Sequence, residues 1–301
     1  MRLTWGDLPE RVTSWVAQEL GGPVVRARSQ PGGFSPGTAD RVTTAQGRRA
    51  FVKAVSPAQN PDTPALHRRE ATVLGSLAGV GGVPRLLASY DDGQWVALLI
   101  EDVEGEHPLP WTHARLAGAL ATLGEVAARP APTSWPALHE ELDAEMRCWD
   151  TLLQTPPPDL DPWLLSHGPE LRELAVSTLP RMAGERVTHT DVRADNLLVE
   201  ADGTVRLVDW PWATRGAPWC DAAMLLLNVR WAGSLDVRDH LGTVHALGAE
   251  PEDVLGILAG LTGFFTWSCT RPASPGLPTL RAFQREQAQA GTQLLRELWP
   301  A

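Results

Sequence analysis

The sequence predicts an α+β fold in two lobes: a five-stranded antiparallel sheet with its helices, followed by a larger and mostly helical lobe. Short β-type runs separated by glycine and proline turns fill the first hundred residues, whereas apolar residues at helical spacing dominate beyond residue 112. Residues 187–199 interrupt the helical part with a polar loop that leads into a short strand. A chain of 301 residues is long for a single domain, and two lobes account for this length. We place the lobes at residues 1–103 and 104–301.

Composition and charge narrow the class of protein. Hydrophobic residues make up 43% of the chain, enough for a substantial core. The formal charge of -10 argues against nonspecific binding to nucleic acid or to an anionic membrane; it is compatible with a cationic ligand, or with simple solubility. The start lacks an apolar signal core, and no apolar run approaches membrane-spanning length. The three cysteines have no metal-type spacing, so reduced thiols and a cytoplasmic protein are expected.

The elements of the first lobe follow from apolar periodicity and turn residues. Residues 7–20 begin with a cap-like Asp and an early Pro and carry one apolar face, so we expect a helix that packs on this lobe. Each predicted strand is bounded by turn residues, and an Asp-Asp-Gly turn at residues 91–93 links the last two into a hairpin. The predicted strands are residues 24–28, 39–44, 49–55, 83–89 and 94–100.

A glycine-rich loop, residues 31–37, lies between the first two predicted strands. Glycine permits positive φ and close approach, so the main-chain N–H groups of such a loop can bind phosphate. A plain Gly-Pro turn would have the same composition. The position of the loop, upstream of a strand that carries a lysine, favours the phosphate-binding interpretation. The candidate residues are Gly32, Gly33, Phe34 and Ser35.

Lys53, in the third predicted strand, is the only lysine of the chain. Lysine offers a compact ammonium that arginine cannot replace, so its single occurrence suggests a specific role. A solvent-facing lysine on an edge strand is the alternative. Glu70 lies 17 residues later in a predicted helix, residues 65–74, on the same side as its apolar residues. An exposed glutamate paired within this helix is the alternative there, and His67 is expected at the surface.

The polar loop has spacing suited to phosphoryl transfer. His189 is followed by Asp191 after two residues and by Asn196 after five more. Phosphoryl transfer requires a carboxylate that orients an acceptor hydroxyl and oxygen ligands for a metal that neutralises phosphate charge. Asp209 stands at the end of the next predicted strand, residues 204–208, and a hairpin would return it to Asn196. Asn196 and Asp209 are therefore candidate Mg²⁺ ligands, and Asp191 is the candidate catalytic carboxylate.

The loop from His189 to Asn196 and the strand that ends in Asp209 resemble the aminoglycoside phosphotransferase family, small-molecule kinases of protein-kinase-like fold. The resemblance implies ATP, with GTP as an alternative, and Mg²⁺. It also implies that Lys53 contacts the α/β-phosphates and that Glu70 pairs with Lys53. The expected hinge, where main-chain groups would recognise adenine, is Glu101, Asp102 and Val103.

Other residues near the loop keep two interpretations. By resemblance Asp221 braces the catalytic loop, but a plain helix cap would look the same in sequence. His189 is expected to support the loop through hydrogen bonds, with a titrating role as the alternative. Arg193 would contact phosphate, or form an ion pair with Asp195 or Asp209.

The second lobe is predicted from helical spacing. One of its predicted helices carries Glu140, Glu141, Asp143, Glu145 and Asp150, which would line a pocket for a cationic acceptor or form a solvated face. Apolar residues of residues 251–268, phenylalanines included, are expected in the core. The predicted helices are residues 112–128, 138–153, 162–179, 222–231, 237–247, 251–268 and 280–298.

Only about a dozen residues separate Asp209 from the helix that follows, which leaves no long activation loop for a peptide substrate. A small-molecule hydroxyl acceptor is therefore predicted, and an aminoglycoside-like or other antibiotic is one candidate. A metabolite kinase of choline, homoserine or sugar type is the first alternative. A nucleotide-binding pseudokinase that acts through partner contacts is the second, although such a scaffold would not require every residue of this catalytic set. The sequence defines neither the acceptor nor the oligomeric state.

Overall fold

The structure, a computed structural model, describes residues 3–30, 37–233, 235–272 and 279–300. The chain forms two compact units. The first unit ends near the predicted boundary at residue 104, but it also includes a later segment of the chain. Unit 1 comprises Met1–His107 and Asp195–Trp212, and unit 2 comprises Pro108–Ala194 and Ala213–Ala301. The segment with Asn196 and Asp209 thus belongs with the sheet and not with the helices. The α+β architecture itself, with a five-stranded antiparallel sheet and a helical part, is as predicted.

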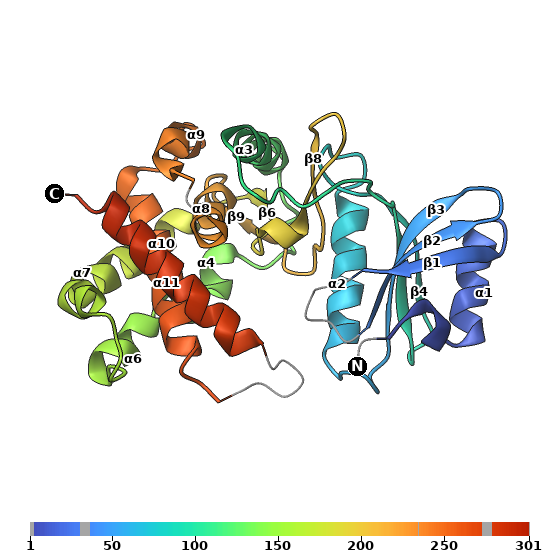
Figure 1. The fold of residues 1–301 in the computed structure, drawn as a ribbon, viewed down its shortest axis with the longest axis horizontal. Helices are drawn as coiled ribbons and strands as arrows, with labels where there is room; N and C mark the ends of the chain where they lie inside the picture. Colours follow the sequence, from blue (N-terminus) through green and yellow to red (C-terminus); the bar gives the residue numbers. More distant parts are fainter. Residues whose placement is uncertain (1–2, 31–36, 234, 273–278, 301) are drawn as a thin grey trace. The chain divides into compact units, whose positions relative to one another are not determined.

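The sheet of unit 1 has the strand order β1-β2-β3-β5-β4, and its strand pairs are antiparallel (Figure 1). In this order β3 lies between β2 and β5, so Lys53 is not on an edge strand. Backbone pairs join Lys53 to Ala39 on one side and to Leu98 on the other. The strands are β1 (Val24–Ser29), β2 (Thr38–Thr44), β3 (Arg49–Val55), β4 (Leu86–Asp91) and β5 (Val96–Ile100).

Two helices flank the sheet of unit 1, α1 (Glu10–Glu19) and α2 (Thr63–Ser76) (Figure 1). Val16 of α1 packs with Val52, which is fully buried, in one apolar cluster. Successive side chains of a strand point to opposite faces, so Lys53 points away from α1. It meets Glu70 of α2 there. The alternation of β3 thus separates an apolar face from a charged one.

A short hairpin, β7 (Leu197–Val199) and β8 (Val205–Leu207), attaches the later segment to unit 1. Leu207 donates its N–H to the carbonyl of Gly82 at 2.7 Å, and Val199 exchanges backbone hydrogen bonds with Glu106. These bonds lie outside the five-stranded sheet and join segments more than ninety residues apart in sequence. They explain why residues 195–212 group with the first unit.

Unit 2 is built from helices around α10. The predicted helix of residues 138–153 forms three short helices instead, and residues 237–247 form a 3₁₀ turn, η4 (Val237–His240), and a short helix. A two-stranded ladder, β6 (Arg186–Thr188) with β9 (Thr214–Gly216), was not predicted. The helices are α3 (His113–Ala127), α4 (Leu138–Glu141), α5 (Asp143–Met146), α6 (Cys148–Gln154), α7 (Pro162–Thr178), α8 (Cys220–Ala232), α9 (Leu241–Ala246), α10 (Pro251–Ser268) and α11 (Leu280–Leu298).

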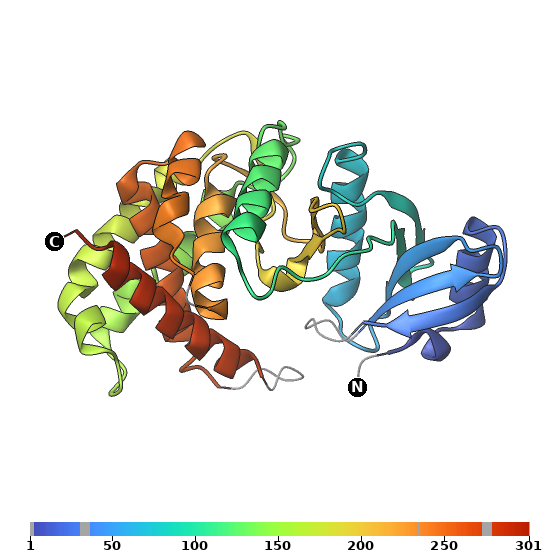
Figure 2. The same ribbon diagram turned by 45° about the horizontal axis from the view of Figure 1, so that its top comes forward.

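The helix α10 is glycine-rich where other helices cross it. A Cβ at Gly260 would overlap Met146 of α5, and a Cβ at Gly263 would lie 2.6 Å from Nε1 of Trp149 on α6. These two glycines therefore allow α5 and α6 to approach one face of α10 closely. On another side α10 runs beside α11, as both views of the ribbon show (Figures 1 and 2). Within the described ranges, no helix is long and apolar enough to cross a membrane.

Candidate active site

The helix α8 holds the polar loop of unit 2 at the end where His189 stands. One carboxylate oxygen of Asp221 accepts the N–H of His189 at 2.6 Å, and the other accepts the N–H of Thr190 at 2.9 Å. Asp221 is the second residue of α8, and the residue in the cap position, Trp219, makes no side-chain cap. The carboxylate therefore serves the loop and not the helix end. Burial raises the pKa of Asp221, and the neighbouring His189 and the two N–H groups oppose this rise.

The same helix holds the far end of the loop. Oδ1 of Asn228 accepts the N–H of Ala194 at 2.9 Å, and both residues are buried. Asp221 and Asn228 are seven residues apart, which is two helical turns, so they project from one face of α8. The sequence analysis did not identify Asn228. The feature of the sequence that could have identified Asn228 is its position seven residues after Asp221, in a helix whose central residues are otherwise apolar.

The backbone beside the candidate catalytic residues is unusual. Among the described residues, two that are not glycine have positive φ: Thr190 at 72° and Asp209 at 67°. Such conformations cost of order 1–3 kcal/mol and persist where the surroundings enforce them. At Thr190 the enforcing contacts are the bond from Asp221 and a hydroxyl contact with Thr214 at 2.9 Å. These contacts fix the backbone conformation of the residue immediately before Asp191.

In unit 1 the structure brings together Lys53, Glu70 and Asp209. Nζ of Lys53 lies 2.7 and 2.8 Å from the two carboxylate oxygens of Glu70 and 2.6 Å from Oδ1 of Asp209. The exposed fraction of the side chain is 14% for Lys53, 2% for Glu70 and 43% for Asp209. Both carboxylates thus pair with the lysine, and that of Glu70 is enclosed whereas that of Asp209 is partly exposed.

The electrostatics of this cluster favour the charged lysine. Burial lowers the pKa of Lys53, but the charges of Asp209 and Glu70 outweigh burial and raise the pKa above its ordinary value. Burial raises the pKa of Glu70, and the attraction of Lys53 opposes that rise. The N–H of Trp210 adds a hydrogen bond to Glu70 at 3.3 Å. The geometry therefore presents a fixed ammonium at the face of the sheet opposite α1.

His67 contradicts its predicted place at the surface. Its exposed fraction is 5%, and it lies one turn before Glu70 on the buried side of α2. Burial, followed by the charge of Lys53, lowers the pKa of His67 to about 3, so the ring is neutral near pH 7. A histidine on a buried stripe is hard to recognise in an arginine-rich helix, where the sequence suggests a polar face.

Asn196 and Asp209 lie at neighbouring positions of the hairpin. The N–H of Val208 donates to the carbonyl of Asn196 at 2.9 Å, and Asp209 is the next residue. A carboxylate that is 43% exposed and an amide oxygen form the kind of small oxygen set that Mg²⁺ takes when phosphate oxygens complete its shell. The residues present therefore fit a divalent ion of this type.

The expected hinge is held by ion pairs of its side chains. Asp102, 5% exposed in its side chain, pairs with Arg49 at 2.6 Å and with Arg41 at 3.2 Å. The N–H of Glu101 donates to Arg85, and the carbonyl of Val103 accepts from Arg41 at 2.6 Å. The segment is therefore fixed within unit 1. The expected phosphate loop, Gly32, Gly33, Phe34 and Ser35, lies outside the described residues.

The family of the chain follows from a comparison with family profiles. The profile described as phosphotransferase enzyme family matches residues 28–258, which is most of the chain. The chain belongs to this family. It is thus a phosphotransferase, and it has a protein-kinase-like fold.

Solved structures of similar fold match this phosphotransferase over almost its whole length. An aminoglycoside phosphotransferase from Alicyclobacillus acidocaldarius is 17% identical, with 97% of this chain and 95% of that chain covered and a TM-score of 0.61. The macrolide 2'-phosphotransferase MphH from Brachybacterium faecium is 14% identical, with 97% and 99% covered and a TM-score of 0.59. The protein chain of a ternary complex of streptomycin, ATP and APH(2")-IIa is 13% identical in sequence, with 97% of both chains covered and a TM-score of 0.54. No curated protein matches the chain.

In this phosphotransferase Arg193 pairs with a residue that was not among its predicted partners. Its Nη1 lies 3.2 Å from Oδ1 of Asp191. The side chains of Arg193 and Asp191 are 20% and 26% exposed. The candidate catalytic carboxylate thus carries a guanidinium beside it and is accessible to a ligand.

Proposed function

We propose that this phosphotransferase moves the γ-phosphate of ATP to a hydroxyl group of a small molecule. The observation that carries the proposal is the enclosed lysine of unit 1, bound by Glu70 on one side and by the partly exposed carboxylate of Asp209 on the other. A cation in this setting suits phosphate, which needs a fixed ammonium and a nearby metal ligand. The similar fold in complex with ATP supports ATP as donor, and GTP is the alternative.

In this proposal each unit has its own task. Lys53 contacts the α/β-phosphates, Glu70 fixes the lysine, and the main-chain N–H groups of residues 32–35 approach the phosphates. Adenine meets main-chain groups of residues 101–103 other than the N–H of Glu101 and the carbonyl of Val103, which are used within the unit. Asn196 and Asp209 hold Mg²⁺, which when bound supplies charge that offsets the phosphate oxygens.

Asp191 orients the acceptor in this proposal. Its carboxylate accepts a hydrogen bond from the acceptor hydroxyl and takes the proton as the bond to phosphorus forms. The transition state of phosphoryl transfer is loose, so orientation contributes more than early deprotonation. His189 and Asp221 keep the loop in place, since the main chain of His189 is bound by Asp221. A kinase that uses ATP in this way would work in the cytoplasm.

The acceptor class is the open part of the proposal. The short segment between Asp209 and α8, which begins at Cys220, includes β9, so no extended platform for a peptide is described there. A small acceptor therefore fits better than a protein. An antibiotic such as an aminoglycoside is one candidate, and a metabolite alcohol such as choline, homoserine or a sugar is the other. A pseudokinase would not need Lys53, Glu70, Asp191, Asn196 and Asp209 together.

A turnover assay across acceptors tests the proposal. ADP formation from ATP and Mg²⁺ would be followed with aminoglycosides, macrolides, peptide antibiotics and small alcohols, with ATP binding measured in parallel. The expected result is ADP formation that rises several-fold with at least one acceptor, together with a phosphate ester of that acceptor by mass spectrometry. Tight ATP binding with no acceptor-stimulated turnover would support the pseudokinase instead.

A further inference from the structure

The surroundings of Asp191 in unit 2 are aromatic as well as cationic. Arg193, which pairs with Asp191, places its guanidinium carbon 5.7 Å from the ring centre of Phe283 on α11. This is the distance of a cation–π contact. A contact path therefore leads from the candidate catalytic carboxylate through an arginine to an aromatic ring.

The path continues into a group of three rings that we call the ring cluster: Trp231, Phe265 and Phe283. The centre of Phe283 lies 5.8 Å from that of Trp231 on α8 and 6.3 Å from that of Phe265 on α10, both edge-on. Helices α8, α10 and α11 thus contribute one ring each. All three side chains are only partly buried. Phe265, which was expected in the core, is partly buried and packs on Phe283.

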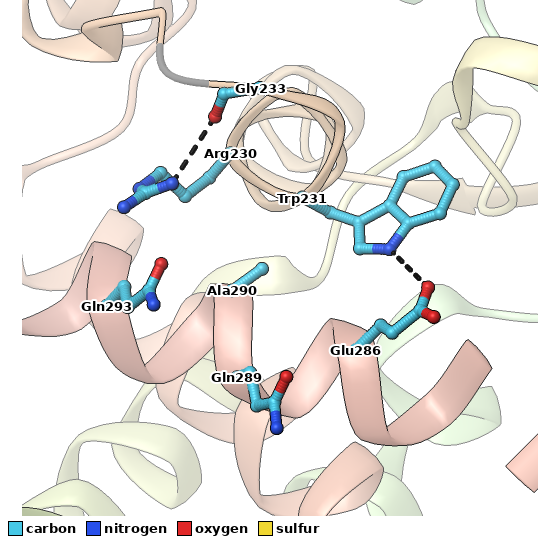
Figure 3. A pocket seen from close by; sticks show the side chains of 7 residues that line it. All are labelled: Arg230, Trp231, Gly233, Glu286, Gln289, Ala290 and Gln293. Atoms are coloured by element: carbon cyan, nitrogen blue, oxygen red, sulfur yellow. Dashed lines mark hydrogen bonds between the residues drawn. The ribbon is translucent and has the colours of Figure 1, made fainter. Parts of the chain in front are cut away.

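A pocket of about 300 Å³ adjoins the ring cluster between α8 and α11. Its lining includes Trp231, Glu286, Gln289 and Gln293 (Figure 3). The indole Nε1 of Trp231 donates to Oε2 of Glu286 at 3.0 Å, as the close view shows. The polar and aromatic groups that line the pocket are therefore one indole, one guanidinium, from Arg230, two side-chain amides and a single carboxylate.

The acidic helix residues of the sequence analysis lie elsewhere in unit 2. They belong to α4, α5 and α6, and the latter two helices pack on the face of α10 that carries Gly260 and Gly263. At 100° per residue, Phe265 projects about 170° away from the middle of that face. Asp143 pairs with Arg147 at 2.9 Å, and Asp150 pairs with Arg172. These carboxylates do not surround the ring cluster, and two of them already hold arginines.

From this arrangement we infer that the acceptor is a neutral or singly cationic hydroxyl compound that lays an apolar ring face on the ring cluster. A polycation needs several carboxylates beside the reactive hydroxyl. Within the described part of unit 2, Arg193 lies beside Asp191 and contacts Phe283, and the pocket next to the ring cluster is lined by one carboxylate, Glu286. Partly exposed aromatic rings suit sugar or aromatic faces, which stack on them. The inference rests on the proposed function and narrows its acceptor class.

The test compares acceptors and removes one ring. Acceptor-stimulated ADP formation would be measured with kanamycin and streptomycin as polycations and with erythromycin as a singly cationic compound. Phenyl β-glucoside and methyl β-glucoside form a matched neutral pair that differs in one apolar ring. We expect the acceptor with the highest kcat/KM to be one of the compounds that are not polycations. We also expect a higher kcat/KM for phenyl β-glucoside than for methyl β-glucoside.

For the best acceptor, Phe283→Ala should raise KM about tenfold and change kcat less than threefold, because an aromatic contact contributes to binding and not to the chemical step. Phe283→Tyr should keep the wild-type KM. Trp299→Ala is the control and should leave KM unchanged. This variant removes a partly exposed ring that packs on Trp163 and is not part of the ring cluster. If Phe283→Ala does not fold, Phe283→Leu preserves apolar volume without the ring and should show the same rise.

The outcomes separate this inference from the proposed function. Turnover with a polycation as the best acceptor, or an unchanged KM in Phe283→Ala, would overturn the inference and leave the kinase activity in place. ATP binding without stimulated turnover by any compound would overturn the proposed function and this inference with it.

Discussion

Asp221 and Asn228 project from one face of α8, two turns apart, and hold the two ends of the loop that contains Asp191. A rise of 1.5 Å per residue separates them by about 10.5 Å along the helix. A single rigid element thus fixes the backbone from His189 to Ala194. Thr190 keeps its positive φ with the help of the bond to Asp221 and of its hydroxyl contact with Thr214.

Asp221→Ala should destabilise unit 2 and slow turnover. It leaves two N–H groups without the carboxylate, and each unsatisfied group costs about 1–3 kcal/mol. We expect a loss of about 2–5 kcal/mol in the free energy of unfolding, measured by urea. In the folded fraction kcat should fall by about a hundredfold, since misplacement of a positioned group by about 1 Å has that effect.

Asn228→Ala should act in the same direction and less strongly, because one N–H loses its acceptor, at about 1–3 kcal/mol. Asp150→Ala is the control: its pair with Arg172 is partly exposed, and we expect a change well under 1 kcal/mol. ATP affinity should be unchanged in all three variants. Wild-type kcat in Asp221→Ala would show that the loop does not depend on α8.

Glu70→Ala should weaken both stability and ATP binding. The variant leaves the enclosed ammonium of Lys53 with Asp209 alone, and loss of one partner of a buried pair costs about 3–5 kcal/mol. We expect at least a tenfold rise in the ATP dissociation constant, measured by calorimetry. Glu104→Ala removes a carboxylate that is 70% exposed and pairs with Arg49, so it should change neither quantity measurably.

Acid should destabilise the protein through His67. Its pKa is lowered to about 3 in the folded state, against about 6.5 in the unfolded chain. The unfolded state therefore binds more protons between these values, and stability falls as pH drops below about 6.5. The slope is about 1.4 kcal/mol per pH unit, or about 2 kcal/mol at pH 5.0.

The check is urea unfolding of the wild type and of His67→Gln at pH 7.5 and 5.0. His67→Gln should be less stable at pH 7.5 because it disturbs a buried position, but its loss between the two pH values should be about 2 kcal/mol smaller. Equal losses in both proteins would mean that His67 takes up its proton in the folded state.

Much of the fold could be predicted because local patterns and packing agree. The strand with Lys53 has apolar residues at alternate positions, Ala50, Val52 and Ala54, and α10 and α11 match their predicted ranges to the residue. The helix expected at residues 138–153 forms three short helices that pack on two neighbours: α4 lies near β9, and α5 and α6 lie on the glycines of α10. Apolar spacing reports that a segment is buried, but not where neighbouring helices bend it.

Parts of the site escaped the sequence for a different reason. Asn228 is an ordinary helix residue until its side chain is seen to meet Ala194, 34 positions away. Arg193 pairs with Asp191, two residues before it, but in the sequence other carboxylates were equally suitable partners for this arginine. Contacts of this kind depend on which elements pack together, and residue type alone does not specify them. The pairing of Lys53 with Glu70 was expected from the resemblance to the family, and the two side chains lie 2.7 Å apart.

The variant Asp191→Asn tests the central claim most directly. It removes the carboxylate that would orient the acceptor hydroxyl and keeps the shape of the side chain. Transfer of labelled phosphate from ATP to the best acceptor should fall by about a hundredfold to ten-thousandfold, while the ATP dissociation constant and the unfolding free energy stay near wild type. Phosphate transfer at the wild-type rate would contradict the account.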